Sequence, residues 1–515
     1  MGGANTELSG PDFGVGVDIG QVPEGVPFLG HAEGEAIVVV RRGNEAFAVG
    51  ATCTHYGGPL AEGLVDGDKI HCPWHHACFS LRTGEALAAP ALNPVLCWSV
   101  EQKGEKLVVL AKKQPAKKAP SSTHPKQIVI VGGGAAGHAA AEMLRREGYR
   151  GKLVMLSADS APPVDRPNLS KDYLAGTAPE EWIPLRPPEF FTENEIELVL
   201  ETRVSAINPT AKVVVTQSGQ TYSYDAVLLA TGGEPVKLGI PGHELPHVHY
   251  LRTLADSRAL IEASKTAKRA VVIGASFIGL EAAASLRARG IEVHAVAPEA
   301  RPLEAVMGAE IGAFVRALHE EHGVVFHLED TARAIEKSRV ILASGAALDA
   351  DLVVVGIGVK PRVELAEKAG IPVDRGVLVD EYLETSAKGV FAAGDIARWP
   401  DRHSGQKLRV EHWVVAERQG QVAAKNMLGQ KVPCTIVPFF WSQHYDVQIS
   451  YVGHAKHWDE TAISGNVAAK DCTVALRSGP KTLAVITIGR DKESLAAEVA
   501  FEHDDTVALA RFGSS

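Results

Sequence analysis

The chain has 515 residues, of which 45% are hydrophobic and 22% charged, and its formal net charge is −10. This composition excludes a globally disordered chain, and the length predicts about two to four domains with buried cores. The acidic balance excludes a general nucleic-acid binder, because phosphate binding depends on clustered Lys and Arg side chains.

Targeting and compartment signals are sparse. Residues 1–20 are rich in glycine, are expected to be loosely ordered, and lack the basic and apolar regions of a signal peptide. No apolar run of about 18 residues occurs, so no membrane-spanning helix is expected. Six cysteines are too few for a secreted disulfide framework. We therefore expect a reducing, cytoplasmic setting.

Short apolar runs alternate with glycine-containing turns in the first part of the chain. They include Ala36–Val40, Phe47–Val49 and Leu107–Leu110. This pattern predicts a small all-β domain, whose bounds we place at residues 11–111. The next stretch, 112–125, is rich in Pro, Lys and Ser and is predicted to be a solvated linker.

Two segments of this first domain each carry one cysteine and one histidine. Cys53 and His55 form a CxH pair, and Cys72 and His75 form a CxxH pair. Zinc is the alternative, but zinc sites usually combine a CxxC pair with an HxxxH pair. A Rieske [2Fe–2S] cluster binds two thiolates on one iron and two imidazoles on the other. Each segment supplies one ligand to each iron, so we predict these four residues as its ligands.

The same stretch resembles the Rieske ferredoxin family. Gly58 and Trp74 occupy the positions that hold an extra disulfide in high-potential members, so the resemblance implies the low-potential ferredoxin type. His76 adjoins a ligand, but the spacing favours His75. Cys78 is expected to neighbour the cluster without binding it. Three further cysteines are predicted to be buried structural thiols: Cys97, Cys434 and Cys472.

A glycine motif follows the predicted strand Gln127–Val131 and opens an Ala-rich helix. Its glycines allow a tight turn and bring the pyrophosphate of a dinucleotide close to the helix N-terminus. Asp159 follows at the distance expected of an acid that binds the ribose. The predicted contacts in the motif are Gly132, Gly134, Ala135, Ala136 and Gly137.

The same strand–glycine–helix–strand order returns at Ala270–Val296. The predicted contacts here are Gly274, Ser276, Phe277, Ile278 and Gly279. The repetition predicts two nested α/β Rossmann-like domains. We place the FAD-binding domain at 126–246 and 372–430, and the NAD(P)-binding domain at 247–371. A smaller α+β reductase domain is expected at 431–515.

Further segments resemble ferredoxin reductases of the pyridine nucleotide–disulfide reductase superfamily. They are Asp165–Pro167, Leu169–Lys171, Leu228–Gly233, Gly394-Asp395, Glu411–Trp413 and Phe440–Asp446. Together with the N-terminal domain, the chain is similar to apoptosis-inducing-factor-like reductases of this architecture. The resemblance implies further contacts to FAD or NAD(P) from Arg166, Val204, Ala230, Thr231, Gly232, Arg252, Gly356, Ile357, Gly358, Gly394, Asp395, Glu411, His412 and Trp413.

The resemblance also implies three catalytic residues. Lys171 is expected near the flavin N5, paired with Glu281, where a cation favours the reduced, anionic flavin. Trp441 is expected near the nicotinamide. No cysteine lies between Cys97 and Cys434, so the flavin lacks the dithiol that disulfide reductases use. Its electrons must leave by another route.

These features predict an enzyme, an FAD-dependent NAD(P)H oxidoreductase that passes electrons to its own Rieske cluster and on to an unidentified redox partner. A flavin can connect the two because it exchanges electrons in pairs or singly. The alternative is an apoptosis-inducing-factor-like redox-sensing or binding protein with incidental NAD(P)H oxidation. NADH is favoured over NADPH, because Glu299 follows the second strand, although Arg301 lies close by. A homodimer is one possible assembly.

Overall fold

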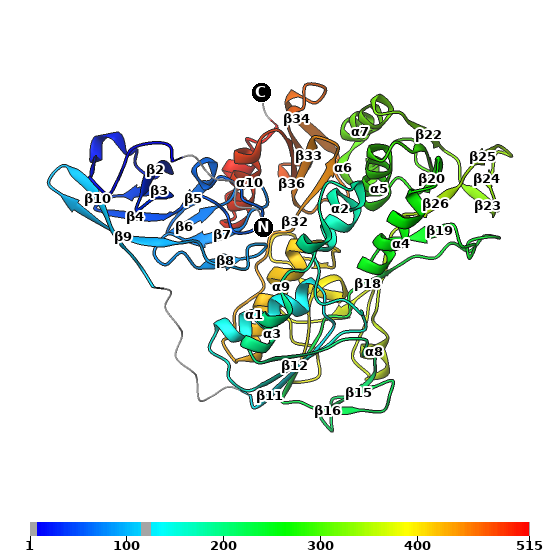
Figure 1. The fold of residues 1–515 in the computed structure, drawn as a ribbon, viewed down its shortest axis with the longest axis horizontal. Coiled ribbons are helices and arrows are strands. Elements are labelled where there is room, and N and C mark those ends of the chain that lie inside the picture. The colour runs from blue at the N-terminus through cyan, green and yellow to red at the C-terminus, as the bar shows by residue number, and fades with distance from the viewer. Residues whose placement is uncertain (1–7, 115–124, 514–515) are drawn as a thin grey trace.

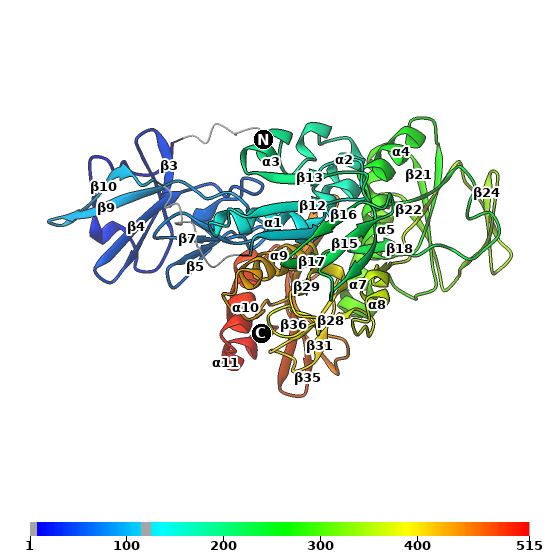
Figure 2. The ribbon, with the colours of Figure 1, turned by 90° about the horizontal axis from the view of Figure 1, so that it is seen from below.

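The chain folds into four regions, and the second Rossmann-like domain shares one hydrophobic core cluster with the C-terminal domain. A computed structural model describes residues 8–114 and 125–513, so most of the expected linker lies outside the described residues. The N-terminal domain and the second Rossmann-like domain lie at opposite ends, with the first Rossmann-like domain and the C-terminal domain between them (Figures 1 and 2). Within the described residues, no helix is long and apolar enough to cross a membrane.

The N-terminal domain consists of two antiparallel sheets. Six strands pair in the order β1-β10-β9-β4-β3-β2, and four pair in the order β5-β6-β7-β8. The strands are β1 Val17–Asp18, β2 Phe28–Ala32, β3 Glu35–Arg42, β4 Glu45–Gly50, β5 Leu64–Asp66, β6 Lys69–His71, β7 Cys78–Ser80, β8 Ala86–Ala88, β9 Cys97–Lys103 and β10 Lys106–Lys112.

Two expectations about the ends of this domain were wrong. Of residues 1–20, the described part from 8 onward is ordered by packing, because Phe13 and Val17 are buried in the core. Val17 also pairs with Leu107 in the sheet. At the other end β10 continues through Lys112, which we had assigned to the linker. Apolar anchors and a strand partner therefore outweigh the local glycine and lysine content.

The two Rossmann-like domains repeat one topology. Parallel strands run in the order β13-β12-β11-β17-β29 in the first and β22-β21-β20-β26-β19 in the second. The first and second strands of each unit are joined by a helix, α1 (Ala135–Arg146) or α5 (Phe277–Ala288). The fifth strand comes from a different part of the chain in each domain. In the first domain it is β29, which follows the whole second domain in sequence, and in the second domain it is β19, which precedes the other strands of that sheet. The nested arrangement follows from this difference.

The bounds of the remaining elements in these two domains are as follows. The parallel strands are β11 Gln127–Val131, β12 Lys152–Leu156, β13 Ile196–Val199, β17 Ala226–Leu229, β29 Val390–Ala392, β19 Val248–Tyr250, β20 Arg269–Ile273, β21 Glu292–Ala297, β22 Val324–Leu328 and β26 Leu352–Val355. The antiparallel strands are β14 Val204–Asn208, β15 Val213–Thr216, β16 Thr221–Ser223, β18 Gly233–Pro235, β23 Ala332–Glu336, β24 Arg339–Leu342, β25 Ala347–Asp349, β27 Val359–Pro361 and β31 Lys407–Leu408, with β28 Val377–Leu378 and β30 Ala397–Pro400 beside them. The helices are α2 Asp172–Ala175, α3 Pro188–Glu193, α4 Leu254–Ser264, α6 Glu304–Met307, α7 Ala309–Glu321, α8 Glu364–Lys368 and α9 Trp413–Met427.

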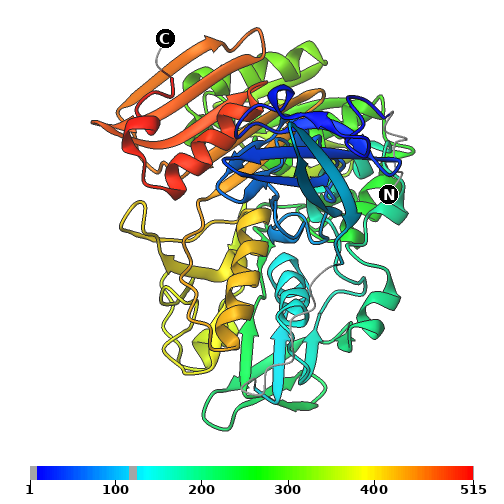
Figure 3. The same ribbon diagram turned by 90° about the vertical axis from the view of Figure 1, so that its left-hand side faces the viewer.

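The C-terminal domain is a five-stranded antiparallel sheet with two helices. Its strands pair in the order β32-β33-β36-β35-β34. Viewed from the end where the N-terminal domain lies, Figure 3 shows that domain above the paired helices α1 and α9 and beside the red C-terminal helices. The elements are β32 Phe439–His444, β33 Val447–Gly453, β34 Glu460–Asn466, β35 Asp471–Ser478, β36 Lys481–Ile488, α10 Asp491–Glu502 and α11 Thr506–Leu509.

Helices α1 and α9 pack so closely that one contact requires glycine. A Cβ at Gly420 of α9 would lie 2.1 Å from the carbonyl oxygen of Ala136 in α1. That distance is well inside van der Waals contact, so any side chain there would force the helices apart. Ala136 lies at the start of α1 beside the glycine turn, so this close approach also fixes the position of the turn.

We predict that Gly420→Ala destabilises the protein, although alanine is the better helix former. The added methyl overpacks the helix contact, which costs about 1–3 kcal/mol of the free energy of unfolding. Denaturant unfolding measures the change. Gly239→Ala is the matched control, because a Cβ there meets nothing within 4 Å. Equal stability of the two variants would contradict the packing argument.

Candidate functional site

The four predicted cluster ligands lie together as two pairs of like atoms. The thiols of Cys53 and Cys72 interact directly enough that each shifts the pKa of the other. The Nδ1 atoms of His55 and His75 are 3.2 Å apart. In the part of the chain that the structure describes, no three or more Cys, His, Asp or Glu side chains converge on one metal-ion position. The thiol pair and the imidazole pair match the two-iron donor set of a Rieske cluster.

The backbone around the thiols suits sulfurs that carry negative charge. Backbone N–H groups of its own loop lower the pKa of each cysteine: those of His55 and Tyr56 act on Cys53, and those of Trp74 and His75 act on Cys72. A Cβ at Gly58 would lie only 2.7 Å from the sulfur of Cys72. Glycine therefore lets the first loop approach the second cysteine closely, and inward-pointing N–H groups stabilise anionic sulfur.

Burial keeps the paired imidazoles neutral, which is the form that binds metal. It lowers the pKa of His55 to about 3 and holds the pKa of His75 well below its ordinary value. The hydrogen bond between the thiols, together with burial, raises the pKa of Cys53. The same hydrogen bond lowers the pKa of Cys72. One sulfur of the pair is thus favoured as the thiolate, the form that binds iron.

A second site is a cavity of about 590 Å³ between the two glycine motifs and the C-terminal domain. Its wall brings together residues from all three reductase regions. The predicted contacts that line it are Gly134, Ala135, Ala136, Arg166, Lys171, Ala230, Gly232, Arg252, Ser276, Phe277, Ile278, Glu281, Gly356, Gly358, Gly394, Asp395, Glu411, His412, Trp413 and Trp441.

The remaining predicted contacts lie behind or beside this cavity. Gly132, Gly137, Gly274 and Gly279 shape the two turns: a Cβ at Gly137 would lie 1.9 Å from the Gly132 carbonyl oxygen, and one at Gly279 would lie 2.2 Å from that of Gly274. Asp159 reaches the cavity through Arg166, whose Nη2 donates to its carboxylate at 3.1 Å.

Four other predicted contacts do not line the cavity. Val204 lies in β14, and Glu299 is exposed beyond β21. The hydroxyl of Thr231 donates to the Arg362 carbonyl oxygen at 2.7 Å. Ile357 is partly exposed. The geometry gives these residues no direct contact with the cavity, so their roles stay predictions.

Unpaired polar atoms in the cavity wall fit a polar, anionic cofactor. The Nε of Arg252 and the Nδ1 of His412 are buried without a hydrogen-bond partner among the described residues. Arg252 also pairs with Asp395 at 2.6 Å. Burial, reinforced by the nearby Arg252, lowers the pKa of Arg166 to about 10. Two clustered guanidinium groups and the two glycine turns suit the pyrophosphate and ribityl groups of FAD.

Lys171 and Glu281 form an ion pair at the centre of this cavity wall. The Nζ of Lys171 lies 3.0 Å from Glu281 Oε2, and both side chains are largely buried. The hydroxyls of Ser170 and Ser442 donate to the same carboxylate at 2.6 and 2.7 Å. The pairing predicted from sequence is therefore present, and two further donors hold the carboxylate in place.

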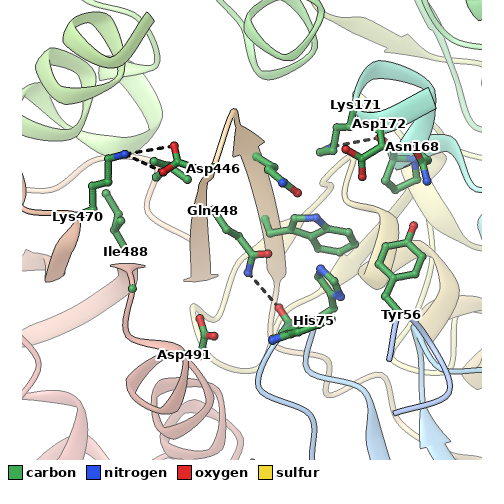
Figure 4. Close-up of a pocket in the computed structure, with 16 residues that line it drawn as sticks. Tyr56, His75, Asn168, Lys171, Asp172, Asp446, Gln448, Lys470, Ile488 and Asp491 are labelled. Carbon is green, nitrogen blue, oxygen red and sulfur yellow. Dashed lines mark hydrogen bonds and ion pairs between the residues drawn. The ribbon is translucent and has the colours of Figure 1, made fainter. Parts of the chain in front are cut away.

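Trp441 connects the cavity with the N-terminal domain. Its ring centroid lies 4.3 Å from that of His75, and its side chain lines the nucleotide cavity. Beside this contact is a second cavity of about 390 Å³. Figure 4 shows His75 and Tyr56 from the N-terminal loops on one side of it and Lys171 and Asn168 on the other. A predicted cluster ligand thus lies one aromatic ring away from the predicted flavin site.

A buried charged cluster holds the N-terminal domain against the reductase. The Nδ1 of His76 lies 2.6 Å from Glu498 Oε2 of α10, and Arg418 of α9 pairs with the other oxygen of that carboxylate. Arg418 also donates to the carbonyl oxygens of His76 and Ala89, at 2.9 and 3.0 Å. Ser494 completes the cluster at 3.1 Å from His76 Nε2. Three domains contribute to it.

Sequence analysis missed this interface. His76 was noted only as a neighbour of a ligand, and nothing in the spacing of Arg418 or Glu498 connects them with it. A second contact, from the Tyr56 hydroxyl to Asp165, joins the first cluster loop to a segment that we had assigned to the flavin site. Interdomain partners separated by hundreds of residues leave no local signal in a single sequence.

Three family matches cover the described domains in order. Residues 15–102 match the Rieske [2Fe–2S] domain, residues 126–420 match pyridine nucleotide-disulphide oxidoreductase, and residues 439–514 match the reductase C-terminal domain. The chain therefore belongs to the pyridine nucleotide-disulphide oxidoreductase family. It is a ferredoxin reductase-like, FAD-dependent NAD(P)H oxidoreductase with an iron–sulfur Rieske domain. The predicted fold class, enzyme class and cofactors are confirmed.

Similar proteins cover different shares of this chain. Human apoptosis-inducing factor 3 is 32% identical over 479 residues, covering 88% of this chain and 78% of that protein. Rhodocoxin reductase of Rhodococcus erythropolis is 34% identical over 375 residues, covering 72% of this chain and 88% of that protein. The solved covalent complex of putidaredoxin reductase with putidaredoxin gives a TM-score of 0.71 at 33% identity, covering 73% of this chain and 93% of that one.

We predict that Glu498→Gln weakens the docking of the N-terminal domain. The change leaves the Arg418 charge buried without its partner, which costs about 3–5 kcal/mol of the free energy of unfolding. Denaturant unfolding measures this loss, and Lys492→Gln on the exposed face of α10 is the control. Adding Arg418→Met to the first variant should recover part of the stability. A stability equal to that of the control would contradict the buried pairing.

The same cluster predicts an acid-sensitive docking. Burial alone would raise the pKa of Glu498, but Arg418 and His76 outweigh it and hold that pKa well below its ordinary value. The stabilisation is therefore complete above the pKa of an unfolded glutamate, about 4.3, and is lost as the pH falls below it. Unfolding measured from pH 7 to pH 3 should show a steeper loss for the native chain than for Glu498→Gln.

Proposed function

We propose that this protein takes electrons from NAD(P)H at its flavin site and passes them singly to the Rieske cluster of the same chain, and from there to a redox partner. The observation that carries the proposal is the contact of His75 with Trp441, whose ring centroids are 4.3 Å apart. Electron transfer through protein weakens steeply with distance. A ligand of one cofactor in contact with the wall of the other cofactor's site favours transfer between them.

In this proposal Cys53 and Cys72 bind one iron, and His55 and His75 bind the other. The first glycine motif, Arg166, Arg252 and the Gly394-Asp395 turn hold FAD. The second glycine motif holds NAD(P)H. Bound FAD supplies the exchange between a two-electron donor and a one-electron acceptor. Lys171, positioned by Glu281, stabilises negative charge at the flavin, and Trp441 lies between flavin and cluster.

The buried docking cluster supports an internal route. His76, Arg418 and Glu498 hold the N-terminal domain against the reductase, and in this arrangement His75 contacts Trp441. The domain that carries the cluster therefore needs no diffusional encounter to receive electrons. One related reductase was solved in a covalent complex with a partner named putidaredoxin. Here a domain of the same chain takes the place of such a partner.

A second candidate function is redox sensing. The human relative that matches both the N-terminal domain and the reductase is named apoptosis-inducing factor 3. In this reading, reduction by NAD(P)H changes the association state of the protein, and turnover is incidental. Light scattering before and after anaerobic addition of NADH distinguishes the two. A change in molecular mass with slow cytochrome c reduction would favour sensing over electron transfer.

We predict that Cys72→Ser removes the cluster and its electron output. The serine hydroxyl is a poor replacement for a thiolate ligand, so the reduced protein should lose the EPR signal of a His₂Cys₂ cluster. Cytochrome c reduction should fall by about tenfold or more, because electrons lose their internal acceptor. Flavin reduction by NADH, followed by absorbance, reports the intact reductase. Cys78→Ser, three residues beyond His75, should keep the signal. Unchanged cytochrome c reduction in Cys72→Ser would contradict the route.

We predict that Glu299→Arg shifts coenzyme preference toward NADPH. An acid after the second strand accepts hydrogen bonds from the ribose of NAD, whereas an arginine accommodates the 2′-phosphate of NADP. The ratio of kcat/KM for NADH to that for NADPH should fall by about tenfold, equivalent to about 1.4 kcal/mol. Glu329→Arg, also outside the cavity and on the next loop, is the control. An unchanged ratio would show that Glu299 does not bind the ribose of the coenzyme.

A further inference from the structure

An unbroken chain of hydrogen bonds leads away from the Lys171–Glu281 pair. Ser442 Oγ donates to Glu281 Oε1 at 2.7 Å and lies 3.1 Å from His444 Nε2. His444 Nδ1 lies 3.1 Å from His319 Nε2. His319 Nδ1 lies 3.3 Å from the hydroxyl of Tyr445. Beginning at Lys171 Nζ, 3.0 Å from Glu281, the chain therefore has no missing link.

The interior of this chain is closed to solvent, and its far end is not. Glu281, Ser442, His444 and His319 are all buried, the two histidines completely. Tyr445 is partly exposed in the turn between β32 and β33, with the ring of His322 stacked 3.6 Å from its own. The chain thus connects the wall of the flavin cavity with the surface of the C-terminal domain.

Both histidines use both of their ring nitrogens within the chain. Among the described residues, neither His444 nor His319 has another hydrogen-bond partner that would divert a nitrogen. A neutral imidazole accepts a proton on one nitrogen and releases one from the other. A hydroxyl also donates and accepts. Every group between Glu281 and Tyr445 can therefore pass a proton on to the next.

Burial supports this role, because a relay needs neutral imidazoles. It lowers the pKa of His444 to about 3, with a further contribution from the Lys171 charge. It holds the pKa of His319 well below its ordinary value, with smaller contributions from His444 and His322. At the outer end, burial raises the pKa of Tyr445 despite the nearby Arg287. All three groups are thus neutral near pH 7.

The chemistry of the proposed function leaves a proton to be removed. Oxidation of one NAD(P)H to NAD(P)⁺ delivers two electrons and one proton to the flavin site. An iron–sulfur cluster accepts the electrons one at a time, and the transfer of electrons alone carries no proton away from the flavin site. Once both electrons have left, one proton per NAD(P)H remains beside Lys171 and must reach water. No further oxidant or reductant is needed for this balance.

We propose that Glu281, Ser442, His444, His319 and Tyr445 form a proton relay that carries this proton from Lys171 to the protein surface. The inference rests on the proposed oxidation of a flavin by one-electron acceptors. The proton is left behind whichever acceptor takes the electrons. In the outward direction Glu281 receives the proton, the Ser442 hydroxyl turns from Glu281 Oε1 to His444 Nε2, and Glu281 then donates the proton to Ser442 Oγ. Each following group takes a proton from the cavity side and releases another on the surface side, so one proton leaves from the Tyr445 hydroxyl.

The test compares proton release with flavin oxidation in the holoprotein. His444→Gln is the critical variant, because the amide hydrogen-bonds at both ends but cannot accept a proton at one and release it at the other. The protein is reduced anaerobically with one equivalent of NADH and mixed with ferricyanide in weak buffer containing a pH-indicator dye. In the variant the rate of proton release should fall below that of flavin oxidation by about 100-fold or more, the low end of the contribution that a positioned proton-transfer group makes. In the native chain the two rates should coincide.

A second variant and a control separate the relay from a structural role. Tyr445→Phe removes only the outer hydroxyl and should show the same lag. His322→Phe keeps the ring stacked on Tyr445, changes no member of the relay, and should release its proton as the native chain does. Nitrogen-15 NMR of the oxidised holoprotein provides a readout other than activity. His444 and His319 should each show one protonated and one unprotonated ring nitrogen, and Tyr445→Phe should shift the Nδ1 signal of His319.

Two results would overturn the relay. One is proton release that follows flavin oxidation in both His444→Gln and Tyr445→Phe as it does in the native chain. The other is an imidazole at position 444 or 319 that carries protons on both nitrogens in the oxidised protein. Because ferricyanide can take electrons from the flavin directly, the measurement does not depend on the cluster. If NADH failed to reduce the cluster while the lag persisted, the proposed route would fail and the relay would stand.

Discussion

The arrangement of this protein depends on a buried carboxylate shared by three domains. Glu498 of the C-terminal domain lies between His76 of the N-terminal domain and Arg418 of the first Rossmann-like domain. A charge taken out of water is costly unless it is paired and hydrogen-bonded. This carboxylate can therefore be buried only when all three domains are in place. The same docking brings His75 against Trp441 and so sets the distance between the two cofactor sites.

The functional site is assembled at the junctions between domains. The glycine turns at the start of α1 and α5 face one cavity because both parallel sheets present their carboxyl-terminal edges to it. The C-terminal strand β32 closes the cavity and supplies residues to two paths. Trp441 faces His75, and Ser442 faces the Lys171–Glu281 pair. Adjacent residues of a strand point to opposite sides, so one strand can serve the proposed electron path and the proposed proton path separately.

Much of the fold and part of the candidate site could be predicted from local patterns. The CxH and CxxH pairs, the two glycine turns and the nested repeat are short motifs whose chemistry depends on residues close in sequence. The expectation of loose order was wrong for residues 8–20, because glycine content is a local property, whereas Phe13 is ordered by a core that it shares with distant strands. The roles of His444 and His319 could not be predicted, because their contact joins β32 to α7 across separate domains.

The sequence alone determined the domain order, the cofactor classes and the kinds of side chain available at each site, since spacing within a loop or turn dictates which atoms can bind a cluster or a pyrophosphate. Only the tertiary structure decided how these sites face one another. The contact of His75 with Trp441, the docking cluster around Glu498 and the hydrogen-bonded chain to Tyr445 each join residues from different domains. Such contacts follow from the packing of whole surfaces, which no short segment of sequence specifies.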